Sequence, residues 1–131
     1  MFRIPRSLKG ALKISEVVEV PEAQLVDGLA IVNQPCGCLM SGDAETGTLY
    51  LIHIEKHTAD TILEDELLNG KAQDDAAGLA HIGINDLIFL NGNLYFTNTA
   101  KDLHGYVPVG HATGKSSAEP SILELPRELC L

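Results

Sequence analysis

The feature that most constrains the fold is a hairpin in the last third of the chain. Residues 84–90 form a mainly apolar run, and residues 94–97 form a second one. Asn91 and Gly92 lie between the two runs, and this pair tolerates the positive φ that both central positions of a tight antiparallel turn require. The sequence therefore predicts two antiparallel strands joined by a two-residue turn.

Both faces of the first strand of this hairpin are apolar. Successive side chains of a strand point to opposite faces, so Leu87 and Phe89 share one face and Ile88 and Leu90 share the other. A strand that is apolar on both faces is typical of a sheet with neighbours on both sides. We expect the rest of the chain to provide such neighbours.

The same order of elements occurs earlier in the chain. Residues 26–31 align with residues 84–89, and residues 39–43 align with residues 94–98. A third segment, residues 49–52, corresponds to residues 105–108, and residues 1–5 resemble that third element alone. An internal repeat of short strands indicates a radial or solenoid β array.

The repeated segments resemble a known family of six-bladed β-propellers, the senescence marker protein, gluconolactonase and luciferin-regenerating-enzyme-like family. The matching segments are residues 26–30, 83–87, 93–99 and 106–108. They are similar to that family's Asn-Gly-Leu start of an inner strand, its Leu-Tyr-aromatic-Thr-Asn/Asp second strand and its Tyr/Trp-Arg-Ile/Val-Pro third strand. NHL-repeat and strictosidine-synthase-like propellers share much of this pattern.

The chain length sets how much of a propeller is present. At roughly 40–50 residues per four-stranded blade, the 131 residues hold two blades and a remnant, and a six-bladed ring needs about twice as much. We expect an all-β fold, a β-propeller fragment of about two four-stranded antiparallel blades plus the outer strands of a preceding blade. Residues 1–20 would end that preceding blade, residues 26–64 would form a complete blade, and residues 84–125 a second blade with a weak last strand. Residues 65–80 are predicted to be a polar surface loop or one short helical turn.

Within the first 20 residues, residues 2–5 would form a third strand and residues 11–20 a fourth. Val18 and Val20 alternate with Glu19, as in a half-solvated outer strand. We interpret residues 2–5 as a strand within a longer propeller rather than as part of a transit peptide.

Charge and composition exclude some partners. The net charge is −9 and the acidic residues are scattered, which disfavours nucleic acid as a partner. No sustained apolar stretch suits a secretory signal or a membrane span, and the sequence does not indicate a localisation. We expect no membrane partner, and we expect the chain to self-associate through exposed blade edges, because two blades leave sheet edges unpaired.

The cysteines and histidines favour structural interpretations. The three cysteines are an odd number, and the pair Cys36 and Cys38 has no second pair at zinc-like spacing, so a structural role is favoured over a metal site. His53 and His57 flank a predicted turn between strands, where solvated side chains are favoured over a pair of metal ligands.

The resemblance implies a site where the inner strands begin, because these starts converge on the central channel of a propeller. In the family this place holds a divalent metal, bound by an early-blade Glu, an Asn at one strand start and an Asp at the next, with the Asp as probable base for lactone hydrolysis. The Asn and the Asp map to Asp27 and Asn85 of this chain, so the two residue types are exchanged. The resemblance thus assigns Asp27 and Asn85 as ligands of calcium or zinc and Asp27 as the catalytic residue.

The exchange weakens the expected chemistry. An amide cannot accept a proton, so Asn85 cannot serve as a general base and Asp27 would have to act from the opposite side of the metal. One carboxylate and one amide also make a weak calcium site. From the residues alone, a role as turn residues that cap the strand starts by bonding to the backbone two residues on is an equally weighted alternative.

The function expected from the resemblance is metal-dependent hydrolysis of a sugar-derived or similar lactone, at a level that the exchanged residues reduce. The alternatives are a non-catalytic NHL-like propeller piece that serves as a binding module, and a truncated gene product without activity.

Overall fold

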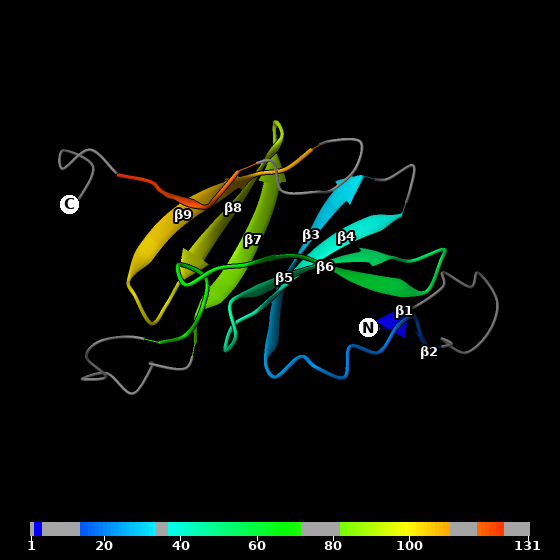
Figure 1. Cartoon of the computed structure of the whole chain (residues 1–131). Helices are drawn as coiled ribbons and strands as arrows, with labels where there is room; N and C mark the ends of the chain where they lie inside the picture. Colours follow the sequence, from blue (N-terminus) through cyan, green and yellow to red (C-terminus); the bar gives the residue numbers. More distant parts are fainter. Residues whose placement is uncertain (1, 4–13, 34–36, 72–81, 111–117, 125–131) are drawn as a thin grey trace.

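The computed structural model describes residues 2–3, 14–33, 37–71, 82–110 and 118–124 of the chain, and in these residues the only regular elements are β-strands. Figure 1 shows their arrangement. The strands are β1 (Phe2–Arg3), β2 (Ser15–Glu16), β3 (Val26–Asn33), β4 (Cys38–Asp43), β5 (Thr48–His53), β6 (Thr58–Glu64), β7 (Ile84–Leu90), β8 (Asn93–Asn98), β9 (Leu103–Pro108) and β10 (Ser121–Ile122). Within the described ranges, no helix is long and apolar enough to cross a membrane.

Eight of these strands form two antiparallel sheets. The first sheet has the order β3-β4-β5-β6 and the second the order β10-β9-β8-β7, so each is a meander in which consecutive strands are neighbours. The predicted all-β fold with two four-stranded antiparallel units is therefore confirmed. The expected complete blade at residues 26–64 coincides with the first sheet, and the second begins at Ile84.

The turn at Asn91 and Gly92 has the predicted conformation. Asn91 has φ 51° and Gly92 has φ 80°, and Leu90 pairs directly with Asn93 across the turn. Positive φ at both central residues matches the right-handed twist of the flanking strands, which fixes the register of β7 against β8.

The second N-terminal strand ends earlier than predicted. β1 pairs antiparallel with β2, as expected for two outer strands, but β2 covers only Ser15 and Glu16. No strand is present over residues 17–20, where the alternation of Val18, Glu19 and Val20 predicted one, and Val17 is buried there instead. Residues 4–13 lie outside the described residues, and so does Leu125 in the predicted last strand of the second unit.

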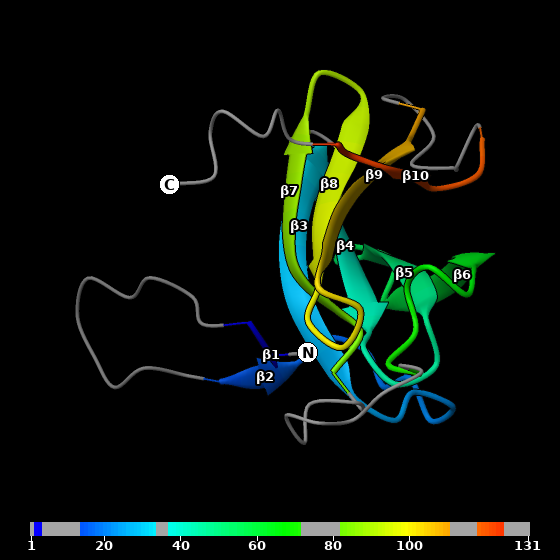
Figure 2. The ribbon, with the colours of Figure 1, turned by 90° about the vertical axis from the view of Figure 1, so that its left-hand side faces the viewer.

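The two sheets pack against each other through their first strands. β3 and β4 contact β7, and Figure 2 shows β3 and β7 side by side at one edge of both sheets. The core between the sheets contains Met40, Leu49, Ile84, Leu94 and Val107, all with no exposed surface. The close sheet spacing depends on Gly42, because a Cβ at that position would lie 2.7 Å from Cγ2 of Ile84.

The outer faces of β3 and β7 are open in the described part of the chain, whereas Tyr50 and Ile52 on the outer face of β5 are buried. Leu87 is buried in the core, but Ile88 is 64% exposed and Leu90 is 55% exposed. The sequence predicted that both faces of β7 would be covered, and this is wrong for the described residues. The alternation of apolar side chains is as predicted, but the neighbour for the second face is not part of what the structure describes.

The loop after β6 is more buried than predicted. Leu68 is fully buried and Asn69 nearly so, and the amide N of Ile84 donates to the carbonyl of Leu68 over 2.7 Å. Residues 65–70 thus line the start of β7 and contribute to the core. The polar composition of residues 65–80 concealed this, and residues 72–80 lie outside the described residues.

Candidate functional site at the strand starts

The two neighbouring edge strands, β3 and β7, each carry a β-bulge at their start. The register shifts between Asp27 and Leu29 in β3 and between Ile84 and Leu87 in β7. A bulge redirects the side chains around it and often lies next to a functional site. The two predicted site residues, Asp27 and Asn85, lie at these bulges.

The two bulged starts touch through their backbones. Gly28 has φ 70°, and a Cβ at this position would lie only 2.0 Å from the carbonyl oxygen of Asn85. Only glycine permits both this conformation and this approach. The structure therefore brings the segment of Asp27 next to the segment of Asn85, although they are far apart in the sequence.

The side chains of the two residues have separate partners. Oδ1 of Asp27 accepts a hydrogen bond from the amide N of Gly28 at 2.8 Å, and Nδ2 of Asn85 donates to Oγ1 of Thr99 at 3.3 Å. Both residues are half-buried. Asp27 therefore does bond to backbone, as the capping alternative predicted, but to the next residue rather than two residues on.

As a metal site the pair is poor. It offers one carboxylate and one amide oxygen, whereas calcium takes six to eight oxygens. Among the residues that the structure describes, no group of three or more His, Cys, Asp or Glu side chains could hold a metal ion. The described residues at the strand starts would therefore hold a calcium or zinc ion only weakly.

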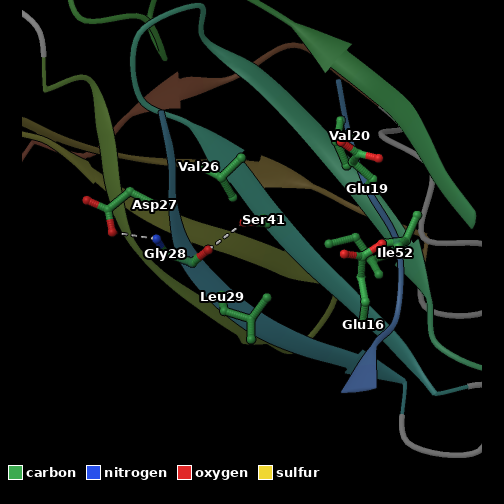
Figure 3. A pocket seen from close by; sticks show the side chains of 10 residues that line it. Glu16, Glu19, Val20, Val26, Asp27, Gly28, Leu29, Ser41 and Ile52 are labelled. Carbon is green, nitrogen blue, oxygen red and sulfur yellow. Dashed lines mark hydrogen bonds between the residues drawn. The ribbon is translucent and has the colours of Figure 1, made fainter. Parts of the chain in front are cut away.

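A cavity of about 540 Å³ lies on the outer face of β3. Its walls include Val26 and Leu29 from β3, Ile52 from β5, and Glu16 and Glu19 from the N-terminal segment. Figure 3 shows the two glutamates on one side of the cavity and Asp27 on the opposite side, with its carboxylate directed away from Val26 and Leu29. Asp27 and Gly28 also line this cavity, so it adjoins the predicted site at the start of β3.

A buried carboxylate that sequence reasoning did not single out lies at the end of β4. Asp43 has no exposed surface, and its two oxygens accept backbone N–H groups from Gln24, Leu25, Glu45 and Thr46 at 2.8 to 3.2 Å. Burial by itself raises the pKa of Asp43, but the four N–H donors together outweigh it and leave the pKa below its ordinary value. Asp43 therefore connects the residues before β3, Gln24 and Leu25, to the turn between β4 and β5.

The equivalent position in the second unit is Asn98. Its Oδ1 accepts the amide N–H of Lys101, as Asp43 accepts that of Thr46, while its Nδ2 donates to the carbonyls of Leu67 and Asn69. A carboxylate accepts only, whereas an amide also donates, so each unit has the side chain that matches its neighbouring backbone. The alignment of residues 39–43 with residues 94–98 contained this signal.

The described side chains of His53, His57 and Cys38 have partners away from the strand starts. His53 is half-buried rather than solvated, with Nδ1 3.4 Å from Sγ of Cys38 and Nε2 3.5 Å from Oδ2 of Asp60. His57 is exposed and its Nδ1 donates to the carbonyl of Val17 at 2.7 Å. The two histidines therefore bind different partners and do not form a common site, while Cys36 lies outside the described residues.

A scan of the chain against models of known protein families gives no match, and a search of curated proteins gives none either.

Proposed function

We propose that this chain is part of a β-propeller of the senescence marker protein, gluconolactonase and luciferin-regenerating-enzyme-like kind, and that it binds a small hydroxyl-bearing molecule, such as a sugar-derived lactone, at the starts of β3 and β7. Two four-stranded antiparallel meanders that lie with their first strands side by side support the propeller part of this proposal. Bulges at the same place in both strands support it further.

The observation that carries the binding proposal is the contact between Gly28 and the carbonyl of Asn85. This contact places a carboxylate and an amide at adjoining strand starts. A carboxylate accepts hydrogen bonds from sugar hydroxyls, and an amide both accepts and donates. Half-buried polar groups of this kind orient a small polar ligand.

The same residues favour binding over turnover. Hydrolysis of a lactone adds water across the ring ester, which requires a general base for the water and stabilisation of the negative charge on the carbonyl oxygen. Asn85 cannot act as a base, Oδ1 of Asp27 already accepts from Gly28, and the pair is a poor metal site. We therefore propose a binding module in which hydrolysis is absent.

The proposal is tested by titrating the protein with an aldonolactone and with its stable cyclic-ether analogue. Calorimetry and ligand-observed NMR measure the binding. Asp27→Asn removes the carboxylate and should weaken binding roughly tenfold or more, because hydrogen bonds to charged groups contribute about 1.5–3 kcal/mol. Asp86→Asn is the matched control, since Asp86 is an exposed aspartate at the start of β7. It should leave binding unchanged.

Three results would contradict the proposal. The first is that neither ligand binds. The second is that Asp27→Asn and Asp86→Asn weaken binding equally. In the third, a Glu16→Gln, Glu19→Gln double variant loses binding while Asp27→Asn does not, which would move the ligand to the cavity beside β3. A pH-stat assay decides the enzymatic alternative, because metal-dependent turnover above the buffer rate would restore Asp27 as a catalytic residue.

A further inference from the structure

The packing between the two sheets has two non-identical sides. On the side of the first sheet, Ala30, Val32 and Met40 face the core. On the side of the second sheet, Ile84 and Leu87 of β7 face it. The sheets approach closely where Ile84 occupies the space above Gly42.

The internal repeat shows that the open face of the second sheet corresponds in sequence to the core-facing side of the first sheet. The alignment that places residues 26–31 over residues 84–89 places Ala30 over Ile88, and one step further it places Val32 over Leu90. Ile88 and Leu90 are the exposed apolar residues of β7. The open face of the second sheet therefore has the pattern that the first sheet uses inside the molecule.

The open face of β3 corresponds in sequence to the core-facing side of β7. Leu29 aligns with Leu87 and Ile31 aligns with Phe89, and the two residues of β3 are 52% and 58% exposed. Figure 3 shows Val26 and Leu29 apart from the segment of Glu16 to Val20, which lies near Ile52. The outer face of β3 thus remains accessible beside that segment.

We propose that these two open faces bind each other between copies of this chain, so that β3 of one copy packs on β7 and β8 of the next, as β7 packs on β3 and β4 inside each copy. The faces differ, so the association is head to tail and continues from copy to copy until a ring closes. The internal interface already shows that this sequence pattern packs in this way.

The surface shape agrees with this pairing, but one close approach is lost. Ile84 over Gly42 inside the molecule corresponds to Val26 over Thr97 between copies, and the Cβ of Thr97 occupies the space that Gly42 leaves for Cγ2 of Ile84, so the copies must lie further apart here than the two sheets do. The outer face of the second sheet also has a hollow of about 280 Å³, lined by Ile88, Tyr95 and other residues of β7 to β9 and by Leu123. This hollow can receive the protruding side chains of β3.

A second position also makes the interface between copies weaker than the internal one. Gly28, which permits the close approach to Asn85, aligns with Asp86, whose side chain prevents an equivalent approach by the next copy. Asp86 also brings its carboxylate near Asp27 of the neighbouring copy, and every copy has a net charge of −9. We therefore expect a reversible association that strengthens at higher salt concentration, where like charges are screened.

Sedimentation velocity over a series of protein concentrations tests the proposal. Ile88→Glu and Ile31→Glu each place a charge in one of the two faces, and each should weaken association roughly 100-fold because the charge must be buried without a partner. Ile14→Glu is the control, since Ile14 is an equally exposed isoleucine outside both faces. It should associate like the unchanged chain. Far-UV circular dichroism checks that every variant is folded.

Mixing the two weakened variants gives the sharper test. The Ile88→Glu copy keeps an intact β3 face and the Ile31→Glu copy keeps an intact second-sheet face, so an equimolar mixture should form a dimer and stop there. Asp86→Gly should tighten association of the otherwise unchanged chain. The proposal is overturned if the unchanged chain stays monomeric, if only one of the two glutamate variants weakens association, or if the mixture stays monomeric.

Discussion

The buried carboxylate of Asp43 gives the most direct test of how the first sheet is held together. In Asp43→Asn, Oδ1 can still accept from Leu25, Glu45 and Thr46, but an NH₂ group replaces Oδ2 and faces the N–H of Gln24, which now bonds at 2.8 Å. One charge-assisted hydrogen bond is lost and the other three lose their charge assistance. We expect the free energy of unfolding to fall by about 2–4 kcal/mol.

Urea unfolding followed by far-UV circular dichroism, at one low protein concentration, measures this loss. Asp60→Asn is the matched control, because the carboxylate of Asp60 is 65% exposed and only pairs with His53, so its loss should cost less than about 1 kcal/mol. If Asp43→Asn unfolds at the same urea concentration as Asp60→Asn, the four backbone bonds do not anchor β3 as we infer.

The pH dependence of stability provides a second measurement of the same residue. The pKa of Asp43 is lower in the folded protein than its ordinary value of 3.8, so its ionised form stabilises the fold above that value. This contribution should decline as the pH falls from about 4 through the lower folded pKa. Asp43→Asn should lose that part of the acid sensitivity, and an unchanged pH profile would refute the role assigned to the carboxylate.

Three further predictions concern the strand starts and the fold. Gly28→Ala should destabilise the protein by more than the ~1–2 kcal/mol of left-handed strain alone, because its Cβ also meets the carbonyl of Asn85. Gly92→Ala should cost only the strain, because Gly92 also has positive φ but its Cβ would make only an ordinary contact with the carbonyl of Val109 at 3.9 Å, and equal losses of the two variants in urea unfolding would contradict this. Calorimetry should show calcium binding at ~10⁻⁴–10⁻³ M or none, weaker still in Asp27→Ala, and micromolar affinity that disappears with Asp27 would show the site to be a true metal centre. Circular dichroism of the isolated chain should be dominated by strand, and a helix content above about one-third would be incompatible with the two sheets.

The sequence alone determined the features that depend on neighbouring residues. The turn at Asn91 and Gly92, the alternation along β7 and the repeat of strands across both units were all predicted, because turn conformation and side-chain direction follow from local backbone geometry. The same reasoning placed Asp27 and Asn85 at equivalent strand starts, and the structure adds that these starts are in contact.

Only the tertiary structure decided which polar and apolar groups are buried. Asp43 could be recognised as an anchor only once the chain brought Gln24 and Leu25 to it, and Leu68 is in the core although its loop is polar in sequence. Likewise, Leu87 and Ile88 are adjacent and equally apolar, yet the first is buried and the second exposed. Burial depends on which distant segment packs on each face, and a pattern that is local in the chain does not contain that information.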